Sequence, residues 1–200
     1  MQLWDIKNRI TPPTGDEISE ALRKVGYDKI SLSGNVLTKN AETGIDLGGI
    51  AKGYAADVIK ELLLREGIKK GIINLGGNIA TIGGKTAKKD WIIGITDPFS
   101  VDSACTETQV RDMSVVTSGG YQRYFEFCGK RYHHIISPQT GYPAENTLAS
   151  VTVICENSML GDALSTAVFI LGEEDGKALL DQYGAKGIFV RNDGTIIKTY

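Results

Sequence analysis

Cysteine is scarce in this 200-residue chain, which has only Cys105, Cys128 and Cys155, and no two of them form a CxxC pair. An odd number of widely spaced cysteines predicts neither a disulfide framework nor a zinc site. Apolar runs are also short, and none reaches the roughly 18 residues that a membrane-spanning helix needs. The first residues, "MQLWDIKNRITPP", are charged and interrupted by proline where a signal peptide has its apolar segment. We therefore expect the chain as given to be cytoplasmic, or a mature fragment, with no membrane span.

The chain has no large excess of either charge: its formal net charge is -2, and its lysines and arginines form no cluster. This balance argues against nucleic acid as the main partner. With 42% hydrophobic and 23% charged residues, the composition is that of a globular protein. The length is sufficient for a substantial core and fits one large domain or a tight pair; of these we expect a single domain over residues 1–200.

Strand patterns that are interrupted by single helices predict an α+β fold rather than a regular βαβ series. A capping box of Thr14 and Glu17 predicts a first helix that ends near Gly26. Turn residues predict hairpins at 33–35 and at 192–194. The polar stretch at 98–109 is expected to be a loop.

Two helices carry the residues that matter most for function. The first follows a glycine-rich turn and is expected to end at Gly67. The second follows the strand "SVTVIC", with Asn157 or Ser158 as its N-cap and Gly172 as its C-terminal stop.

Glycine marks four turns: "DLGGIAKG" (46–53), "NLGGN" (74–78), "TSGGY" (117–121) and "TGYP" (140–143). Each one alone is compatible with an ordinary turn. The first is more informative because it leads directly into a helix and carries Lys52, an arrangement that binds phosphate through backbone N–H groups and the helix dipole. The chain has no GxxxxGK[ST] or GxGxxG motif, so this is not a standard nucleotide-binding loop.

The only two histidines, His133 and His134, are adjacent in "RYHHIISP". Neighbouring side chains on a strand point to opposite faces, so only one of the two can serve a given pocket. A structural or surface role is possible for either. A rigid turn follows them at 140–143, which favours a functional role, and a histidine with a near-neutral pKa can act as a general base.

The stretch "DALSTAVFILG" (162–172) places Asp162 and Thr166 one turn apart on an otherwise apolar helix. One interpretation is structural: a helix-capping carboxylate and a threonine that bonds its own i−4 carbonyl. The other is a cation site, because a buried carboxylate without a partner is costly. Oxygen-only ligands favour Mg²⁺ or Ca²⁺.

Five motifs, "DLGGIAKGYAAD", "NLGGN", "TSGGYQRYFE", "RYHHIISPQTGYP" and "SVTVICENSMLGDALSTAVFILG", occur here in the order and rough spacing of the ApbE family of flavin transferases, which the chain resembles. The resemblance implies an α+β, T-fold-like architecture of mostly antiparallel sheets with interspersed helices. It also implies a Mg²⁺-dependent enzyme that binds FAD and transfers FMN to a Thr or Ser hydroxyl of an acceptor flavoprotein, releasing AMP. The acceptor motif would be of the Ser/Thr-Gly-Ala-Thr type.

The same resemblance implies roles for individual residues. Asp162 and Thr166 would hold Mg²⁺ together with the main-chain carbonyl of Gly49. The reactive histidine would be His134, which takes the proton from the attacking hydroxyl. The residues implied to contact FAD are Asp46, Lys52, Gly119 and Ile135.

Members of the family usually have a longer N-terminal region that contacts the adenine and the isoalloxazine, so we expect this sequence to be N-terminally truncated relative to the family. Many are periplasmic or lipid-anchored. Two alternatives to flavin transfer stay open: a Mg²⁺-dependent FAD pyrophosphatase that releases FMN and AMP, and a non-catalytic FAD- or nucleotide-binding remnant.

Overall fold

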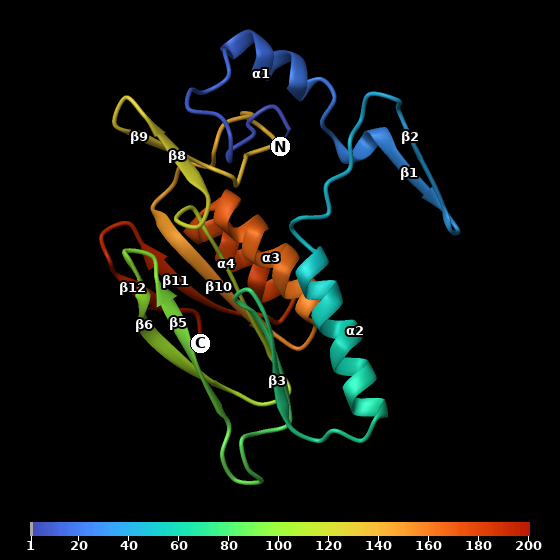
Figure 1. Ribbon diagram of the computed structural model, residues 1–200, viewed down its shortest axis with the longest axis vertical. Coiled ribbons are helices and arrows are strands. Elements are labelled where there is room, and N and C mark those ends of the chain that lie inside the picture. The colour runs from blue at the N-terminus through green and yellow to red at the C-terminus, as the bar shows by residue number, and fades with distance from the viewer. Residues whose placement is uncertain (1) are drawn as a thin grey trace. The chain divides into compact units, whose positions relative to one another are not determined.

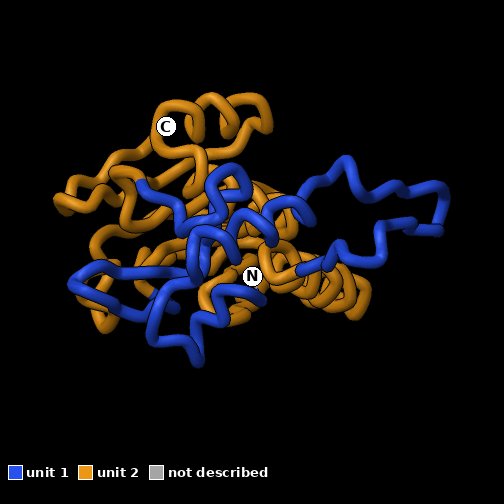
Figure 2. The backbone as a smooth tube through the Cα atoms, turned by 90° about the horizontal axis from the view of Figure 1, so that it is seen from above, with its two compact units in different colours: residues 1–46, 122–145 blue, residues 47–121, 146–200 orange. Residues whose placement is uncertain are grey.

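The computed structural model describes residues 2–200 and divides into two compact units (Figure 2). The smaller unit comprises residues 1–46 and 122–145, and the larger comprises residues 47–121 and 146–200. Each unit is described by itself below. The expectation of a single domain over residues 1–200 stays a prediction.

A six-stranded sheet forms the centre of the larger unit, with the strand order β12-β11-β10-β7-β4-β3. Every neighbouring pair is antiparallel. The strands are β3 (Gly71–Leu75), β4 (Asn78–Ile82), β7 (Ser114–Gly119), β10 (Leu148–Cys155), β11 (Lys186–Arg191) and β12 (Ile196–Lys198).

Three helices cover one face of this sheet: α2 (Ala51–Arg65), α3 (Ser158–Leu171) and α4 (Glu173–Gln182) (Figure 1). Alternate side chains of β7 pack against different layers on the two faces of the sheet. Val116 lies against Gly161 of α3, while its neighbour Val115 packs into a cluster with Ile93 and Ile95 on the other face.

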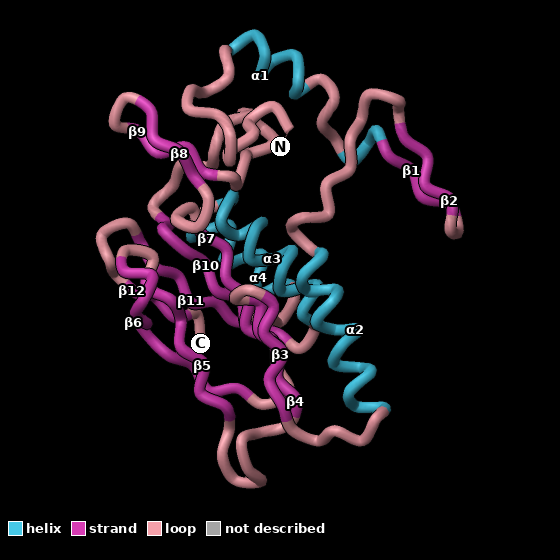
Figure 3. The backbone as a smooth tube through the Cα atoms, viewed as in Figure 1, coloured by secondary structure: helices cyan, strands magenta, loops and turns pink. Residues whose placement is uncertain are grey.

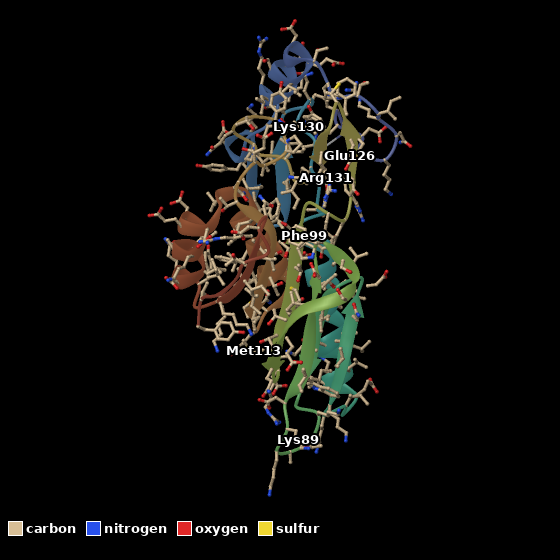
Figure 4. The ribbon with its side chains drawn as sticks, turned by 90° about the vertical axis from the view of Figure 1, so that its left-hand side faces the viewer. Lys89, Phe99, Met113, Glu126, Lys130 and Arg131 are labelled. Atoms are coloured by element: carbon tan, nitrogen blue, oxygen red, sulfur yellow. The ribbon has the colours of Figure 1, made fainter. Side chains whose placement is uncertain are left out.

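The second face is covered by the hairpin of β5 (Trp91–Asp97) and β6 (Ser100–Val110), seen beside the sheet in Figure 3. The expectation of a loop at 98–109 is therefore wrong. An antiparallel strand with one solvated face needs apolar residues only at alternate positions, and here only Thr108 and Val110 are buried. The turn itself is tight, and Phe99 projects from it (Figure 4).

The smaller unit has an aromatic core and several short elements, not all of which contact that core. They are α1 (Gly15–Leu22), the 3₁₀ turn η1 (Tyr27–Lys29), the hairpin β1 (Ile30–Ser33) and β2 (Val36–Lys39), and the hairpin β8 (Tyr124–Phe127) and β9 (Lys130–His133). Trp4 is 2% exposed, packs with Ile18 and Phe125, and donates its indole N–H to the Gly141 carbonyl at 2.7 Å. The β8–β9 hairpin carries the Glu126–Arg131 ion pair (Figure 4).

Most of the predicted boundaries are confirmed. The Thr14 capping box begins α1, which ends at Leu22, before the expected Gly26. Asn157 caps α3, and Gly172 ends it. The mixture of antiparallel sheets and few helices confirms the α+β prediction. In residues 2–200, no helix combines the length and apolarity that crossing a membrane requires.

Candidate functional site

The N-terminal halves of α2 and α3 cross at very short range. A Cβ on Gly53 would lie 2.3 Å from the Ser158 carbonyl oxygen and 2.6 Å from the Met159 Cα, both of which are backbone atoms. Only glycine therefore fits at this crossing. The close approach brings the backbone of α2 within hydrogen-bonding range of side chains on α3.

Each of these helices receives a carboxylate from the other. Asp162 of α3 accepts a hydrogen bond from the Gly53 N–H in the first turn of α2, at 2.9 Å. Asp57 of α2 accepts from the Ser158 and Met159 N–H groups in the first turn of α3, each at 2.8 Å. These bonds satisfy N–H groups that a helix cannot pair by itself and place negative charge at both positive dipole ends.

Asp162 is buried, with 4% of its surface exposed. Burial raises the pKa of its carboxyl group above the ordinary value, although the Gly53 N–H and the charge of Lys52 act in the opposite direction. The Gly53 N–H and the charge of Lys52 thus do not outweigh the effect of burial on this carboxylate. A bound cation would add further positive charge.

Two further residues near Asp162 could supply oxygen ligands to a cation. Thr166 lies one turn along α3, and its Oγ1 is 3.4 Å from the Asp162 carbonyl oxygen. Gly49 is adjacent to Thr166, because a Cβ on Gly49 would lie 3.8 Å from that Oγ1. A carboxylate, a hydroxyl and a peptide segment with its carbonyl form the donor chemistry that a hard cation prefers.

The structural interpretation of this pair is partly correct, since Asp162 caps α2 through Oδ2 and Thr166 makes a long i−4 contact. The capping bond uses one carboxylate oxygen; in the described part of the chain no hydrogen bond to Oδ1 is found. Within residues 2–200, no group of three or more His, Cys, Asp or Glu side chains is placed to hold a metal. A cation here would therefore depend on one carboxylate and neutral oxygens, and the residues present fit that role.

Lys52 and Gly119 belong to the same unit. Lys52 is exposed on the first turn of α2, where its charge acts on Asp162. Gly119 is buried at the end of β7, and a Cβ there would lie 2.5 Å from the Tyr121 ring and 3.0 Å from the Ala149 carbonyl oxygen. The larger unit thus holds five of the predicted site residues: Gly49, Lys52, Gly119, Asp162 and Thr166.

The smaller unit holds the other three, Asp46, His134 and Ile135. Asp46 is exposed, and Ile135 is 5% exposed. The Nδ1 of His134 lies 3.3 Å from the Arg123 carbonyl oxygen. A carbonyl can only accept, so this ring carries a proton on Nδ1 and, when neutral, its lone pair on Nε2.

His133 is held as a neutral structural residue. Its Nδ1 accepts from the Ile135 N–H at 3.2 Å, and its Nε2 donates to the Ala144 carbonyl at 3.1 Å. Burial lowers the pKa of this imidazole. That only one histidine serves chemistry, and that it is His134, stays a prediction.

Sequence reasoning missed several residues that shape the site. Gly53 was visible as a glycine inside a helical pattern, and Ser165 as the neighbour of Thr166. The contacts of Asp57 with α3 and of Ser118 with α3 link segments about a hundred and about fifty residues apart. No local pattern reveals such pairs.

Comparison with known proteins identifies relatives of the whole chain. A model described as "ApbE family" matches residues 1–189. The chain is 38% identical over 212 residues to an FAD:protein FMN transferase of Treponema pallidum (strain Nichols), covering 96% of this chain and 59% of that protein. It is 46% identical over 155 residues to one of Klebsiella pneumoniae (strain 342), covering 76% and 47%.

Solved structures give the same result. The crystal structure of the ApbE protein from Thermotoga maritima matches with a TM-score of 0.90 and 35% identity, over 98% of this chain and 66% of that one. The apo form of the flavinyl transferase ApbE from Pseudomonas stutzeri matches with a TM-score of 0.84 and 33% identity, over 99% and 64%. The chain therefore spans about half to two thirds of the length of the relatives that it matches.

Proposed function

Because this chain belongs to the ApbE family, we propose that it transfers FMN from FAD to a Thr or Ser hydroxyl of an acceptor flavoprotein and releases AMP. The observation that carries the proposal is the group of oxygen donors at Asp162, Thr166 and Gly49, beside the first turn of α2. FAD is the substrate, and the acceptor segment would be of the Ser/Thr-Gly-Ala-Thr type.

Asp162, Thr166 and the Gly49 carbonyl would hold Mg²⁺. When bound, this cation supplies charge neutralisation for a pyrophosphate and for the leaving phosphate. The raised pKa of the Asp162 carboxyl supports a cation at this point, since burial disfavours its charged form more than the Gly53 N–H and Lys52 favour it.

Lys52 and the N-terminus of α2 would bind the phosphates directly. The helix begins without a side-chain cap from Ile50, and Lys52 is exposed in its first turn. N–H groups at a helix start and an ammonium group both favour negative charge. Gly119, Asp46 and Ile135 are further proposed contacts of FAD.

His134 would act as the general base. With Nδ1 bonded to the Arg123 carbonyl, the Nε2 lone pair can take a proton. The acceptor oxygen attacks the flavin-side phosphorus as its proton passes to Nε2. A new P–O bond to the acceptor forms as the bond between this phosphorus and the bridging oxygen breaks. The bridging oxygen leaves as part of AMP.

The test incubates the 200-residue chain with FAD, Mg²⁺ and a peptide that carries the acceptor motif. We expect flavin-labelled peptide and AMP in equal amounts. Asp162→Ala should abolish both products, whereas Asp181→Ala, an exposed aspartate of α4, should leave them unchanged. AMP without labelled peptide would indicate a pyrophosphatase, and no turnover would indicate a nucleotide-binding protein without transferase activity.

A further inference from the structure

Three side-chain hydroxyl groups and one carbonyl form a connected chain of contacts between β7 and α3. Ser118 Oγ on β7 lies 2.8 Å from Ser165 Oγ and 3.2 Å from Thr166 Oγ1, both on α3. Ser165 Oγ lies 3.0 Å from the carbonyl oxygen of Asp162. Ser165 and Asp162 are both buried, so water cannot readily replace these partners.

Counting protons gives this chain a direction. A hydroxyl has one proton to donate, and a carbonyl has none. Ser165 must therefore donate to the Asp162 carbonyl, which leaves Ser118 as the donor in its contact with Ser165. The proton of Ser118 is then used, so Thr166 is the donor in its contact with Ser118.

We propose that Ser118 and Ser165 are positioning residues that turn the Thr166 hydroxyl proton toward β7 and so leave the lone pairs of Thr166 Oγ1 for a divalent cation. The inference rests on the proposed cation site. The competing i−4 contact of Thr166 with the Asp162 carbonyl is longer, at 3.4 Å, and that carbonyl already accepts from Ser165. The shorter contact with Ser118 therefore determines the orientation of the Thr166 hydroxyl.

A neighbouring hydroxyl pair provides a matched control. Thr117 Oγ1 and Thr152 Oγ1 lie 2.8 Å apart on β7 and β10. Since Thr117 directly precedes Ser118 on the strand, its side chain points to the opposite face of the sheet. Removing this pair costs a hydroxyl–hydroxyl bond of the same length without touching α3.

The experiment measures cation binding rather than activity, by Mg²⁺ calorimetry and by electron paramagnetic resonance of bound Mn²⁺, on the full chain and its variants. Ser118→Ala should weaken binding about two- to tenfold, the range expected for one lost hydrogen bond. Ser165→Ala should also weaken cation binding, although Ser165 makes no bond to Thr166 Oγ1 in this chain of hydrogen bonds. Without Ser165 as its acceptor, Ser118 can donate its proton to Thr166 Oγ1, which then uses a lone pair. Ser118→Thr, which keeps the hydroxyl, should bind like the parent, as should Thr152→Ala.

Parent affinity in Ser118→Ala would overturn the proposal while leaving the cation site intact. Parent affinity in Ser165→Ala alone would overturn the donor and acceptor roles that we assign along this chain of hydrogen bonds. Equal weakening in Ser118→Ala and Thr152→Ala would show that only general destabilisation was measured, which also contradicts the proposal. Absence of binding to the parent protein would overturn the cation site and the positioning role together.

Discussion

Replacing Asp162 by asparagine tests two inferences separately. One is that burial disfavours the charged carboxylate, and the other is that this carboxylate binds a cation. The pKa of the carboxyl is raised by burial, so the folded protein favours the neutral form relative to the unfolded chain. Asparagine resembles that neutral form and can still accept the Gly53 N–H. We therefore expect Asp162→Asn to unfold, without divalent cations at pH 7, with a free energy equal to or greater than that of the parent.

The sign of the pH dependence follows from the same shift. A raised pKa means that the folded state binds the proton more tightly, so stability falls as pH rises through the interval above about 4, the ordinary pKa of aspartate. The parent should show this loss, and the variant should lack it. The difference between them should therefore grow from pH 4 to neutrality.

Mg²⁺ should reverse the order of stability. A cation at a hundred times its dissociation constant stabilises the folded state by about 2.7 kcal/mol. For a chain of this size that corresponds to a rise in Tm of about 5–11 °C. The parent should show this rise and Asp162→Asn should not.

Thermal unfolding followed by circular dichroism, with EDTA and with a MgCl₂ series, measures both effects. Equal Mg²⁺-dependent stabilisation of parent and variant would refute the assignment of Asp162 to the cation. A large destabilisation of the variant in EDTA would refute the argument from burial, because the charged form would then be favoured by the fold.

Three further predictions concern the histidines and the crossing of α2 and α3. His134→Ala should reduce flavin transfer by about 10²–10⁴, as expected for a lost general base, and His133→Ala should reduce it less in the same assay; the reverse order would exchange their roles. Because burial lowers the pKa of His133, the unfolded chain takes up protons that the folded chain does not, and stability should fall as pH drops below about 6.5; chemical denaturation should show a smaller fall in His133→Gln. Gly53→Ala should destabilise by about 1–3 kcal/mol in denaturant titrations because its Cβ would meet backbone, while Gly15→Ala, with no atom within 4 Å, should not.

The elements of the fold were largely predictable because their signals are local. The capping box at Thr14, the cap at Asn157 and the stop at Gly172 each depend on residues a few positions apart. The i, i+4 spacing correctly places Asp162 and Thr166 on one helix. Their roles in binding a cation, and those of the FAD-contacting residues, stay predictions.

The errors arose where local composition misrepresents tertiary structure. β6 is polar because most of its residues face solvent, and Val110 packs in the same cluster as Ile93, which lies on its partner strand β5. The direction of the hydroxyl chain could not be predicted either, since Ser118 and Ser165 meet only when β7 and α3 are packed. Pairings of this kind depend on the register of sheet and helix, which sequence spacing does not specify.

The exchange of carboxylates between α2 and α3 would order the proposed cation site before any cation binds. An isolated buried carboxylate would be expensive, but the positive end of α2 holds one oxygen of Asp162 through the Gly53 N–H at 2.9 Å. That bond also fixes the side chain, and Asp57 fixes α3 in return through the Ser158 and Met159 N–H groups. A cation at the proposed site would therefore meet a carboxylate whose rotamer is already ordered, so its binding would not carry that entropy cost. Burial of the charged carboxylate by itself disfavours the folded state, and the helix N–H group compensates this cost only in part, so a bound cation would stabilise the fold.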